Sequence, residues 1–413
     1  MGSFIYLTPL FLYFPRFIPG VETQPLLTLA LALGSLCTSS RSRPRVAFAL
    51  MTATLVGWTL LRTTIVGGAS ASLSLLQLMI GPLILFGAIA RHAPPPSRST
   101  LAWITAFFSA AAVLEMLAPG VYGALASSIL DRSTVTDGHR GISAFTPEPT
   151  YATITLVYFL LLARWAHMRG DAAHPWIEWG LGAVLMATLS TYLLVLVIAV
   201  ALVRRPGWFL AVGLAFLAAL PLLTSGALEN DDSIRAVVAV SRILSSDFSD
   251  FLPSISLIDS SIGSRLLTNV ASLKTPVTAP LGLGLDCNSV PSAFDAAGFD
   301  FAFSNPVLSQ VIDGGCLKPQ SYAAATTLGL GALALPFVLA LAFAFRYALG
   351  SRRARPWGDA FAIAITLILV QVQLTSPIPW LLLYIAAAAR QPVGASRASR
   401  PAPASKPLPL PSQ

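Results

Sequence analysis

The chain has 413 residues, of which 55% are hydrophobic and only 11% are Asp, Glu, Lys or Arg. Soluble domains carry about 25% charged residues, so this chain has less than half the usual charge for covering a folded surface in water. The mean hydropathy of +0.73 points the same way. This composition excludes a soluble enzyme, a secreted binding module and a disordered hub, and it predicts an integral membrane protein.

The charge of the chain indicates topology signals and not a nucleic-acid surface. The 26 basic and 18 acidic residues give a net charge of +8. The basic residues are almost all arginines, and most of them lie at the ends of apolar segments, as the positive-inside rule describes. A nucleic-acid surface needs basic residues clustered on a soluble face.

Apolar segments of near-spanning length follow one another along most of the chain. A transmembrane helix needs about 20 such residues. The stretch 176–203 is long for one tilted helix and short for two. Two spans place 17 of the 26 basic residues on one side of the membrane, which favours that model and cytoplasmic termini. We therefore expect an all-α polytopic protein of about twelve transmembrane helices, at residues 4–15, 22–37, 46–62, 71–90, 101–118, 151–166, 176–190, 191–203, 207–224, 323–345, 357–374 and 377–390.

Two loops then lie on the outer face, at 119–150 and 225–322. The longer one has ten acidic and five basic residues, a net charge of −5. Apolar residues at helical spacing in 233–244 and 263–273 predict a small folded, mainly helical cap. A loop this long is usually functional.

The chain therefore divides into an N-terminal transmembrane bundle (1–224), the large outer loop (225–322), C-terminal transmembrane helices (323–390) and a tail (391–413). The tail is rich in Pro, Ala, Ser and Arg, which predicts a disordered cytoplasmic end. No internal repeat is convincing, which weakens the case for an inverted-repeat transporter.

Two of the three cysteines, Cys287 and Cys316, lie in the large outer loop, and Cys37 lies in an apolar span. A disulfide between the first two is favoured on an oxidising face and contributes about 3–4 kcal/mol in the chain-entropy model. Two free thiols are the alternative. Three cysteines are too few for a zinc cluster.

The end of the first outer loop carries the residues that best suggest chemistry. Glu148 stands at the mouth of a span, where a charge costs energy unless it has a partner. Two prolines flank it and hold the backbone extended. The alternative is an acidic residue that complements a helix dipole. Arg140 and His139 precede it, and each of these also fits an ordinary polar surface residue.

The large outer loop carries further arginines. Arg265 lies about fifteen residues before a Pro-Leu-Gly-Leu-Gly turn, and Arg235 and Arg242 are one heptad apart. Arginine suits phosphate because its planar fork stays ionised and donates paired hydrogen bonds. Two Arg-bearing loops above a helical bundle can clamp a pyrophosphate, although each arginine alone also fits a solvated surface cation. The scattered Asp residues match no calcium-loop spacing, and we expect no metal site.

This layout and three short motifs resemble the Wzy-type polysaccharide polymerases and the related O-antigen ligases. The segment Arg140-Gly141, Phe145 and Glu148-Pro149-Thr150-Tyr151 is similar to the Arg…Glu-Pro-Ser-Tyr segment of exopolysaccharide polymerases, with threonine in place of the serine. Leu189-Ser190-Thr191-Tyr192 is similar to the family's Leu-Ser-x-Ser turn between two spans. Arg265 with Pro280-Leu281-Gly282-Leu283-Gly284 resembles the arginine and Pro-Leu-x-Gly-x-Gly of the large loop, with the glycines one position earlier.

The resemblance implies a GT-C-like glycosyltransferase of the bacterial inner (cytoplasmic) membrane that acts on the periplasmic face. It implies polymerisation of undecaprenyl-pyrophosphate-linked oligosaccharide repeat units into exopolysaccharide or O-antigen. The activated lipid holds the energy, so we expect no nucleotide, metal or other cofactor. A flippase and a chain-length regulator of the same pathway are possible partners, and nucleic acid is not one.

In this interpretation Arg140 and Arg265 hold the pyrophosphate and stabilise the charge that develops as it leaves. Glu148 acts as general base or orients Arg140. Four further residues are candidates for contact with the substrate: His139, Tyr151, Arg235 and Arg242.

Three alternatives stay open. An O-antigen or protein O-glycosylation ligase moves a finished glycan to another acceptor, but the late loop lacks the histidine that ligases tend to carry there. A flippase or transporter needs charged residues deep within its spans, whereas Arg62, Glu115 and Glu178 lie near span ends. A non-catalytic scaffold for an export complex is the third.

Overall fold

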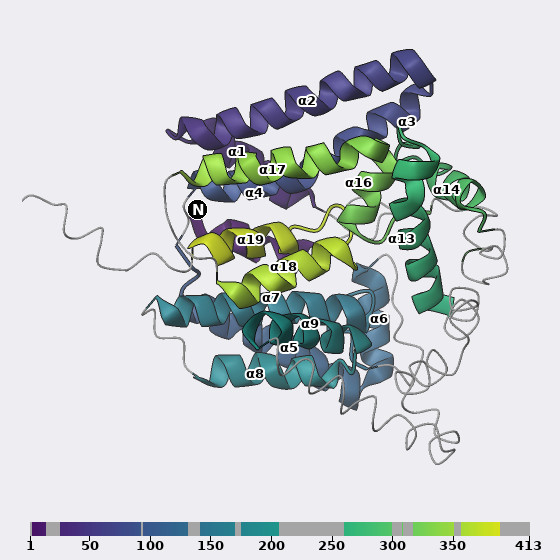
Figure 1. Cartoon of the computed structure of the whole chain (residues 1–413). Coiled ribbons are helices and arrows are strands. Elements are labelled where there is room, and N and C mark those ends of the chain that lie inside the picture. The colour runs from purple at the N-terminus through teal and green to yellow at the C-terminus, as the bar shows by residue number, and fades with distance from the viewer. Residues whose placement is uncertain are drawn as a thin grey trace, which may run out of the picture.

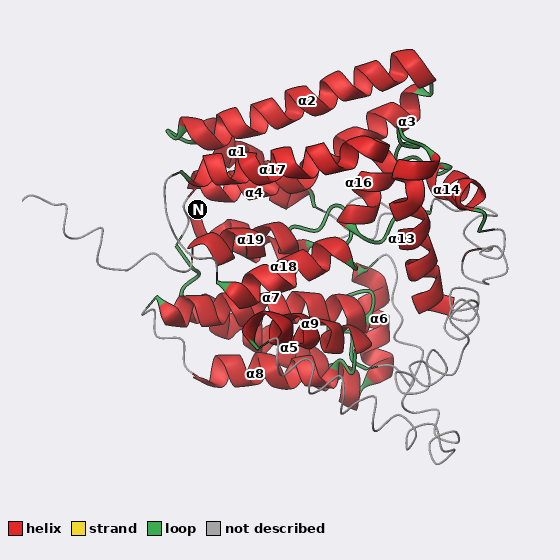
Figure 2. Cartoon of the chain, viewed as in Figure 1, coloured by secondary structure: helices red, strands yellow, loops and turns green. Residues whose placement is uncertain are grey.

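The computed structural model describes residues 2–13, 25–91, 94–130, 141–169, 175–205, 260–299, 308, 317–350 and 357–388. Every regular element in these ranges is a helix (Figure 2), which confirms the all-α prediction for the described part of the chain. Figure 1 shows most helices side by side in one bundle, with α13 and α14 at one end of it.

The elements follow one another with few long breaks. In chain order they are η1 (Gly2–Phe11), α1 (Leu26–Thr38), α2 (Ser42–Val66), α3 (Ala69–Leu73), η2 (Ser74–Met79), α4 (Ile80–Arg91), α5 (Arg98–Leu117), α6 (Pro119–Ile129), α7 (Pro149–Met168), α8 (Pro175–Ala187), α9 (Thr191–Arg204), α13 (Ser260–Thr278), α14 (Ser289–Ala297), α16 (Tyr322–Leu330), η5 (Gly331–Leu333), α17 (Ala334–Leu349), α18 (Gly358–Leu369) and α19 (Ile378–Ala388).

Four helical segments are long and apolar enough to cross a membrane: Ser42–Val66, Ala69–Arg91, Arg98–Leu117 and Tyr322–Leu349. Others are apolar but shorter. The 13 residues of α1 rise about 20 Å, against a hydrocarbon core of about 30 Å. The structure thus supports a membrane protein with four such segments in its described part, and the count of twelve stays a prediction. The predicted span 207–224 lies outside the described residues, and the predicted span 4–15 is instead a short 3-10 helix.

Burial in the bundle follows the pattern of a protein in lipid. The central helix α7 is enclosed by its neighbours, and its large side chains Tyr158, Phe159 and Trp165 are fully buried. Large apolar side chains also cover the outside, such as Leu60 (63% exposed) on α2 and Trp103 (76%) on α5. Such broad apolar exposure marks a membrane or protein contact, and a bilayer satisfies it.

The stretch 176–203 forms two helices, as the charge argument favours. Helix α8 ends at Ala187 and α9 begins at Thr191, after a turn in which Leu189 has a φ of 45°. The Ser190 side chain caps α9 by accepting a hydrogen bond from the Tyr192 N–H at 3.2 Å. A side-chain cap and a left-handed residue are the usual ways to end one helix and start another.

Arginines assigned to one side of the membrane do meet at one end of the bundle. The Arg204 Nε at the end of α9 donates to Asp359 Oδ1 at the start of α18, at 2.6 Å. Arg169, just after α7, donates to the Ala388 carbonyl at the end of α19, at 2.7 Å. The assignment of this end to the cytoplasm stays a prediction.

The outer loops are more helical than the sequence indicates. Helix α6 occupies the first part of the predicted loop 119–150. The predicted helix over 263–273 is confirmed by α13, which packs against α14 and α16. The predicted helical segment 233–244 and the tail 391–413 lie outside the described residues.

Candidate functional site

Two of the three residues predicted to be catalytic are in contact. The Arg265 Nη2 of α13 lies 2.7 Å from the Glu148 Oε2 at the start of α7, and 117 residues separate them in the chain. Their side chains are 20% and 16% exposed. The Glu148 backbone is extended, as its flanking prolines predict, and its side chain makes no capping hydrogen bond to α7. The carboxylate therefore has the partner that a charge at the mouth of a span needs.

A second carboxylate holds the backbone that leads to Glu148. Glu115, near the end of α5, accepts hydrogen bonds from the N–H groups of Ser143 and Ala144 at 2.9 Å and from the Ser143 hydroxyl at 3.0 Å. Backbone N–H groups bound to a carboxylate make strong, charge-assisted hydrogen bonds. The sequence analysis placed Glu115 near a span end without a role, and its contacts assign it the role of positioning this segment.

The same segment contains two consecutive residues in the left-handed region. Ala144 has a φ of 44° and Phe145 a φ of 61°, which costs about 1–3 kcal/mol for each non-glycine residue. The hydroxyl of Tyr122 in α6 supports them, because it accepts from the Phe145 N–H and lies 3.1 Å from the Ser143 Oγ. Burial raises the pKa of the Tyr122 phenol, so this hydroxyl stays neutral. Segment 141–148 is thus fixed from two helices.

Gly141 connects this segment to the turn between α8 and α9. A Cβ at Gly141 would overlap the carbonyl of Thr188, so only glycine fits here. The Ile142 N–H donates to the Ala187 carbonyl at 3.2 Å, and the Thr153 and Thr188 hydroxyls lie 2.8 Å apart. The first two motifs of the resemblance, far apart in sequence, therefore pack together. Arg140 and His139 lie outside the described residues.

Helix α13 presents Arg265 from a face of small hydroxyl residues. The buried side chains Ser264, Thr268, Ser272 and Thr275 line one side of it. The Thr268 and Ser272 hydroxyls each donate to the carbonyl four residues earlier, at 2.7 Å. Small residues with internally satisfied hydroxyls let helices approach closely within a membrane protein. This face packs α13 against α16, so Arg265 is presented from a rigid element.

The Pro-Leu-Gly-Leu-Gly turn fits into a break in a spanning helix. The Leu283 N–H donates to the Leu328 carbonyl at 2.7 Å, and the Ala332 N–H donates to the Pro280 carbonyl at 2.9 Å. These bonds satisfy backbone groups that the break between α16 and η5 exposes. Gly282 has a φ of 71°, and a Cβ there would overlap the Gly329 carbonyl. The turn after α13 is therefore anchored by backbone contacts that need glycine.

Buried Arg62 adds a side-chain contact to this turn. Its Nη1 donates to the Ser72 Oγ at 2.8 Å, and its Nη2 donates to the Gly282 carbonyl at 3.3 Å. The Arg62 guanidinium therefore has a structural role, whereas a transport pathway needs such a group to face a polar cavity.

Three residues that the sequence analysis did not assign to the site lie beside Arg265. Asn269 is one turn further along α13 and donates from Nδ2 to the Val370 carbonyl at 2.9 Å. The Tyr192 hydroxyl donates to the Gln371 carbonyl at 3.1 Å. Within the described residues, the buried Asn269 Oδ1 and Gln371 Nε2 have no hydrogen-bond partner. Buried polar atoms of this kind call for an explanation such as a ligand or a water.

Each of these three residues had a different signal in the sequence. Tyr192 closes the second motif, and Asn269 lies four residues after Arg265, on the same helical face. Gln371 has no local sequence signal, because only the packing of α18 brings it to the site.

The predicted substrate contacts have no support from the structure so far. Tyr151 is only 6% exposed, and its ring lies 5.6 Å from that of Tyr13, so packing accounts for it. Arg235 and Arg242 lie outside the described residues. No cluster of three or more His, Cys, Asp or Glu able to hold a metal occurs within the described ranges.

The cysteines fall into two groups. Cys287 is in a disulfide bond, whereas Cys37 on α1 is a free thiol. The predicted partner of Cys287, Cys316, lies outside the described residues, and the chain has no fourth cysteine.

Comparisons of the chain with protein-family models, with curated proteins and with solved structures gave no match. The chemistry of the site therefore has to be argued from its own residues. They provide an arginine in contact with a carboxylate, a hydroxyl, and two amides with unused hydrogen-bonding atoms, all at one end of an apolar bundle.

Proposed function

We propose that this protein is a membrane glycosyltransferase that polymerises undecaprenyl-pyrophosphate-linked oligosaccharide repeat units on the periplasmic face of the inner membrane. The observation that carries the proposal is the contact between Arg265 and Glu148. Each belongs to a separate motif that resembles the Wzy-type polymerases, and the two motifs meet at one site.

The location fits a lipid-linked substrate. The lipid tail stays in the bilayer, the sugars reach water, and the pyrophosphate lies where the two meet. In the reaction an acceptor hydroxyl attacks the anomeric carbon of the donor sugar, the bond from that carbon to the pyrophosphate oxygen breaks, and the lipid pyrophosphate leaves. The Arg265 guanidinium stabilises the negative charge that develops on this leaving group, and Arg140 is its proposed second cation.

Glu148 has two proposed roles, which use different oxygen atoms. Its Oε2 holds the Arg265 guanidinium. Its Oε1 makes no hydrogen bond within the described residues and is the candidate acceptor of the proton from the attacking hydroxyl. A Glu148→Gln variant keeps an oxygen for Arg265 and removes the base, so it separates the two roles.

The amides beside Arg265 suit the sugar. Asn269 and Gln371 each have a buried polar atom without a partner in the described part of the chain, and amides both donate and accept hydrogen bonds. Sugar hydroxyls do the same. We assign these two residues and Tyr192 to binding of a sugar next to the reacting bond.

The first test is the profile of lipid-linked glycans in cells that lack the protein. Accumulated single repeat units without longer chains support the polymerase. Long chains retained on the lipid indicate the ligase alternative, and single units trapped on the cytoplasmic face indicate a flippase.

Complementation with variants then tests the residues. Arg265→Ala is expected to abolish long chains at a normal protein level. Lys274→Ala, which removes an exposed cation from the same helix, is the matched control and is expected to keep them. Full-length polymer from both Arg265→Ala and Arg140→Ala would refute the pyrophosphate clamp, and normal polymer from Glu148→Gln would exclude the base.

A charge swap distinguishes catalysis from packing. Arg265→Glu combined with Glu148→Arg keeps an ion pair but moves the cation to the other helix. We expect the swap to recover the thermal stability that either single change loses, without recovering polymer. Recovery of polymer as well would mean that the pair is only structural.

A further inference from the structure

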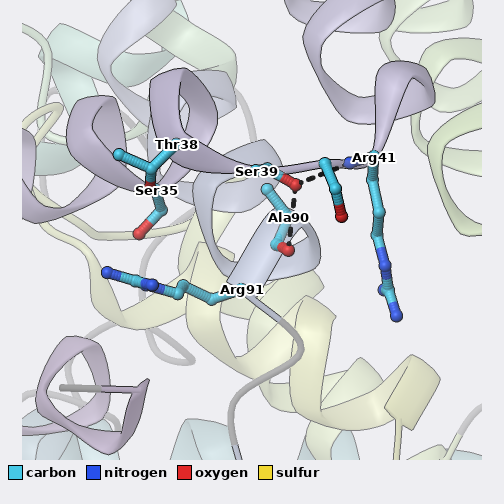
Figure 3. A pocket seen from close by; sticks show the side chains of 7 residues that line it. Ser35, Thr38, Ser39, Arg41, Ala90 and Arg91 are labelled. Atoms are coloured by element: carbon cyan, nitrogen blue, oxygen red, sulfur yellow. Dashed lines mark hydrogen bonds between the residues drawn. The ribbon is translucent and has the colours of Figure 1, made fainter.

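A second polar cavity lies at the other end of the bundle, where α1 and α4 both end and α2 begins (Figure 3). Its volume is about 260 Å³. Four hydroxyl side chains and two guanidinium groups line it: Ser35, Thr38, Ser39, Ser40, Arg41 and Arg91. Helix α2 begins beside this cavity and, 25 residues later, ends near the Pro-Leu-Gly-Leu-Gly turn, so the two sites are about a membrane thickness apart.

The charge of the cavity is positive and uncompensated. No Asp or Glu lines it. Arg91 makes no hydrogen bond or ion pair with any described residue, and the Arg41 Nη1 makes one long contact, 3.5 Å from the Ile89 carbonyl. The dipole of a helix favours a cation at its C-terminal end, which accounts for an arginine after α1 and another in α4. It does not account for a cavity between them that is lined by hydroxyls.

Paired guanidinium groups and hydroxyls together favour an anion with several oxygen atoms. Arg91 extends beneath Ser35 and Thr38, while the Ser39 hydroxyl contacts the Ala90 carbonyl and the Arg41 N–H (Figure 3). Phosphate accepts from guanidinium forks and hydroxyls at the same time. The cavity is smaller than the roughly 300–1,000 Å³ of sites for drug-sized ligands. It therefore suits a phosphate with a small substituent better than a nucleotide.

Apolar surface adjoins the cavity on both of its long helices. Leu33 on α1 is 51% exposed, two residues before Ser35, and on α2 Val46 and Leu50 are exposed within two turns of the helix start. A polar phosphate pocket next to such a surface matches the two halves of an amphiphile. We infer that this cavity binds the phosphate of an anionic phospholipid, whose acyl chains lie against α1 and α2.

The test uses the full-length protein in nanodiscs of phosphatidylcholine with about one fifth phosphatidylglycerol, followed by native mass spectrometry of the lipids that stay bound after release. An arginine near an anionic headgroup changes binding about 5-fold, and two change it about 30-fold. We expect phosphatidylglycerol to remain on the wild type and to be lost, about 30-fold, from the Arg41→Gln/Arg91→Gln variant.

The matched control removes two exposed arginines that do not line the cavity, as Arg98→Gln/Arg346→Gln. It is expected to keep the lipid. Equal loss from control and test variants, or no loss from the test variant, would overturn the inference. If the double variant fails to fold, judged by its Tm in phosphatidylcholine alone, Arg91→Gln at an exposed position provides the same comparison with an expected 5-fold effect.

A second arm separates the two sources of phosphate. Inorganic phosphate and glycerol phosphate, each at millimolar concentration, are added to the protein in detergent, and the Tm is compared with that after addition of phosphatidylglycerol. A rise in Tm with the lipid alone supports the inference. An equal rise with the soluble phosphates would overturn the lipid assignment and leave a site for free phosphate.

Discussion

Replacement of Glu115 by glutamine tests whether one carboxylate fixes the segment that presents Glu148. The carboxylate accepts three hydrogen bonds from Ser143 and Ala144 at 2.9–3.0 Å. Bonds to a charged group contribute about 1.5–3 kcal/mol each. Glutamine keeps one acceptor oxygen but turns an amide N–H₂ towards a backbone N–H, so one or two bonds are lost.

The structure gives the expected magnitude. Loss of these bonds lowers the free energy of local opening of segment 141–148 by about 2–4 kcal/mol. The left-handed residues Ala144 and Phe145 leave the segment little reserve, because their backbone cost has to be offset by the same contacts. Amide hydrogen exchange in this segment is therefore expected to accelerate about 30- to 1,000-fold.

Hydrogen exchange with mass spectrometry on the nanodisc-embedded protein measures this directly, in a peptide that covers 141–148. Glu178→Gln is the matched control, since Glu178 lies on α8 and makes no hydrogen bond within the described residues. We expect acceleration only in the Glu115→Gln protein, together with reduced polymer in complemented cells. Wild-type exchange in 141–148 of that variant, or equal acceleration in the control, would refute the positioning role.

Three further outcomes are expected. Gly282→Ala should lower stability by several kcal/mol in a denaturation assay, whereas Gly298→Ala, with a similar φ of 68° but open space around it, should cost about 1–2 kcal/mol; equal losses would contradict the backbone overlap. A maleimide should label one cysteine of the unfolded, unreduced protein, Cys37, and three after reduction, and labelling of all three without reduction would disprove the Cys287 disulfide. Asp359→Asn should lower the apparent Tm, because about 1.5–3 kcal/mol of charge-assisted bonding to α9 is lost, and an unchanged Tm would show that this contact contributes little.

The resemblance and the structure support different parts of the site. The motifs identified Arg265 and Glu148 as candidates, and their contact at 2.7 Å is confirmed. Tyr151 came from the same motif, yet burial against Tyr13 explains it without a substrate. A short motif mixes residues that face the site with residues that hold the helix, and only the packing separates them.

The sequence alone determined the class of protein and most helix positions. These properties are local: an apolar run near 20 residues long has to bury its backbone as a helix in lipid. The break between α8 and α9 was predictable for a related reason, since the alternation of charge along the chain required it. Helix α6 was missed because its short apolar stretch was assigned to an outer loop.

Only the tertiary structure decided what the site consists of. The pairing of Arg265 with Glu148, the attachment of segment 141–148 to Glu115, and the arrival of Gln371 all join residues far apart in the chain. The insertion of the Pro280–Gly284 turn into a broken helix depends on backbone groups, which carry no residue-specific signal. A hydrogen bond needs its two partners within about 3 Å, and in a bundle of similar apolar helices the packing of small and large side chains decides which segments come that close.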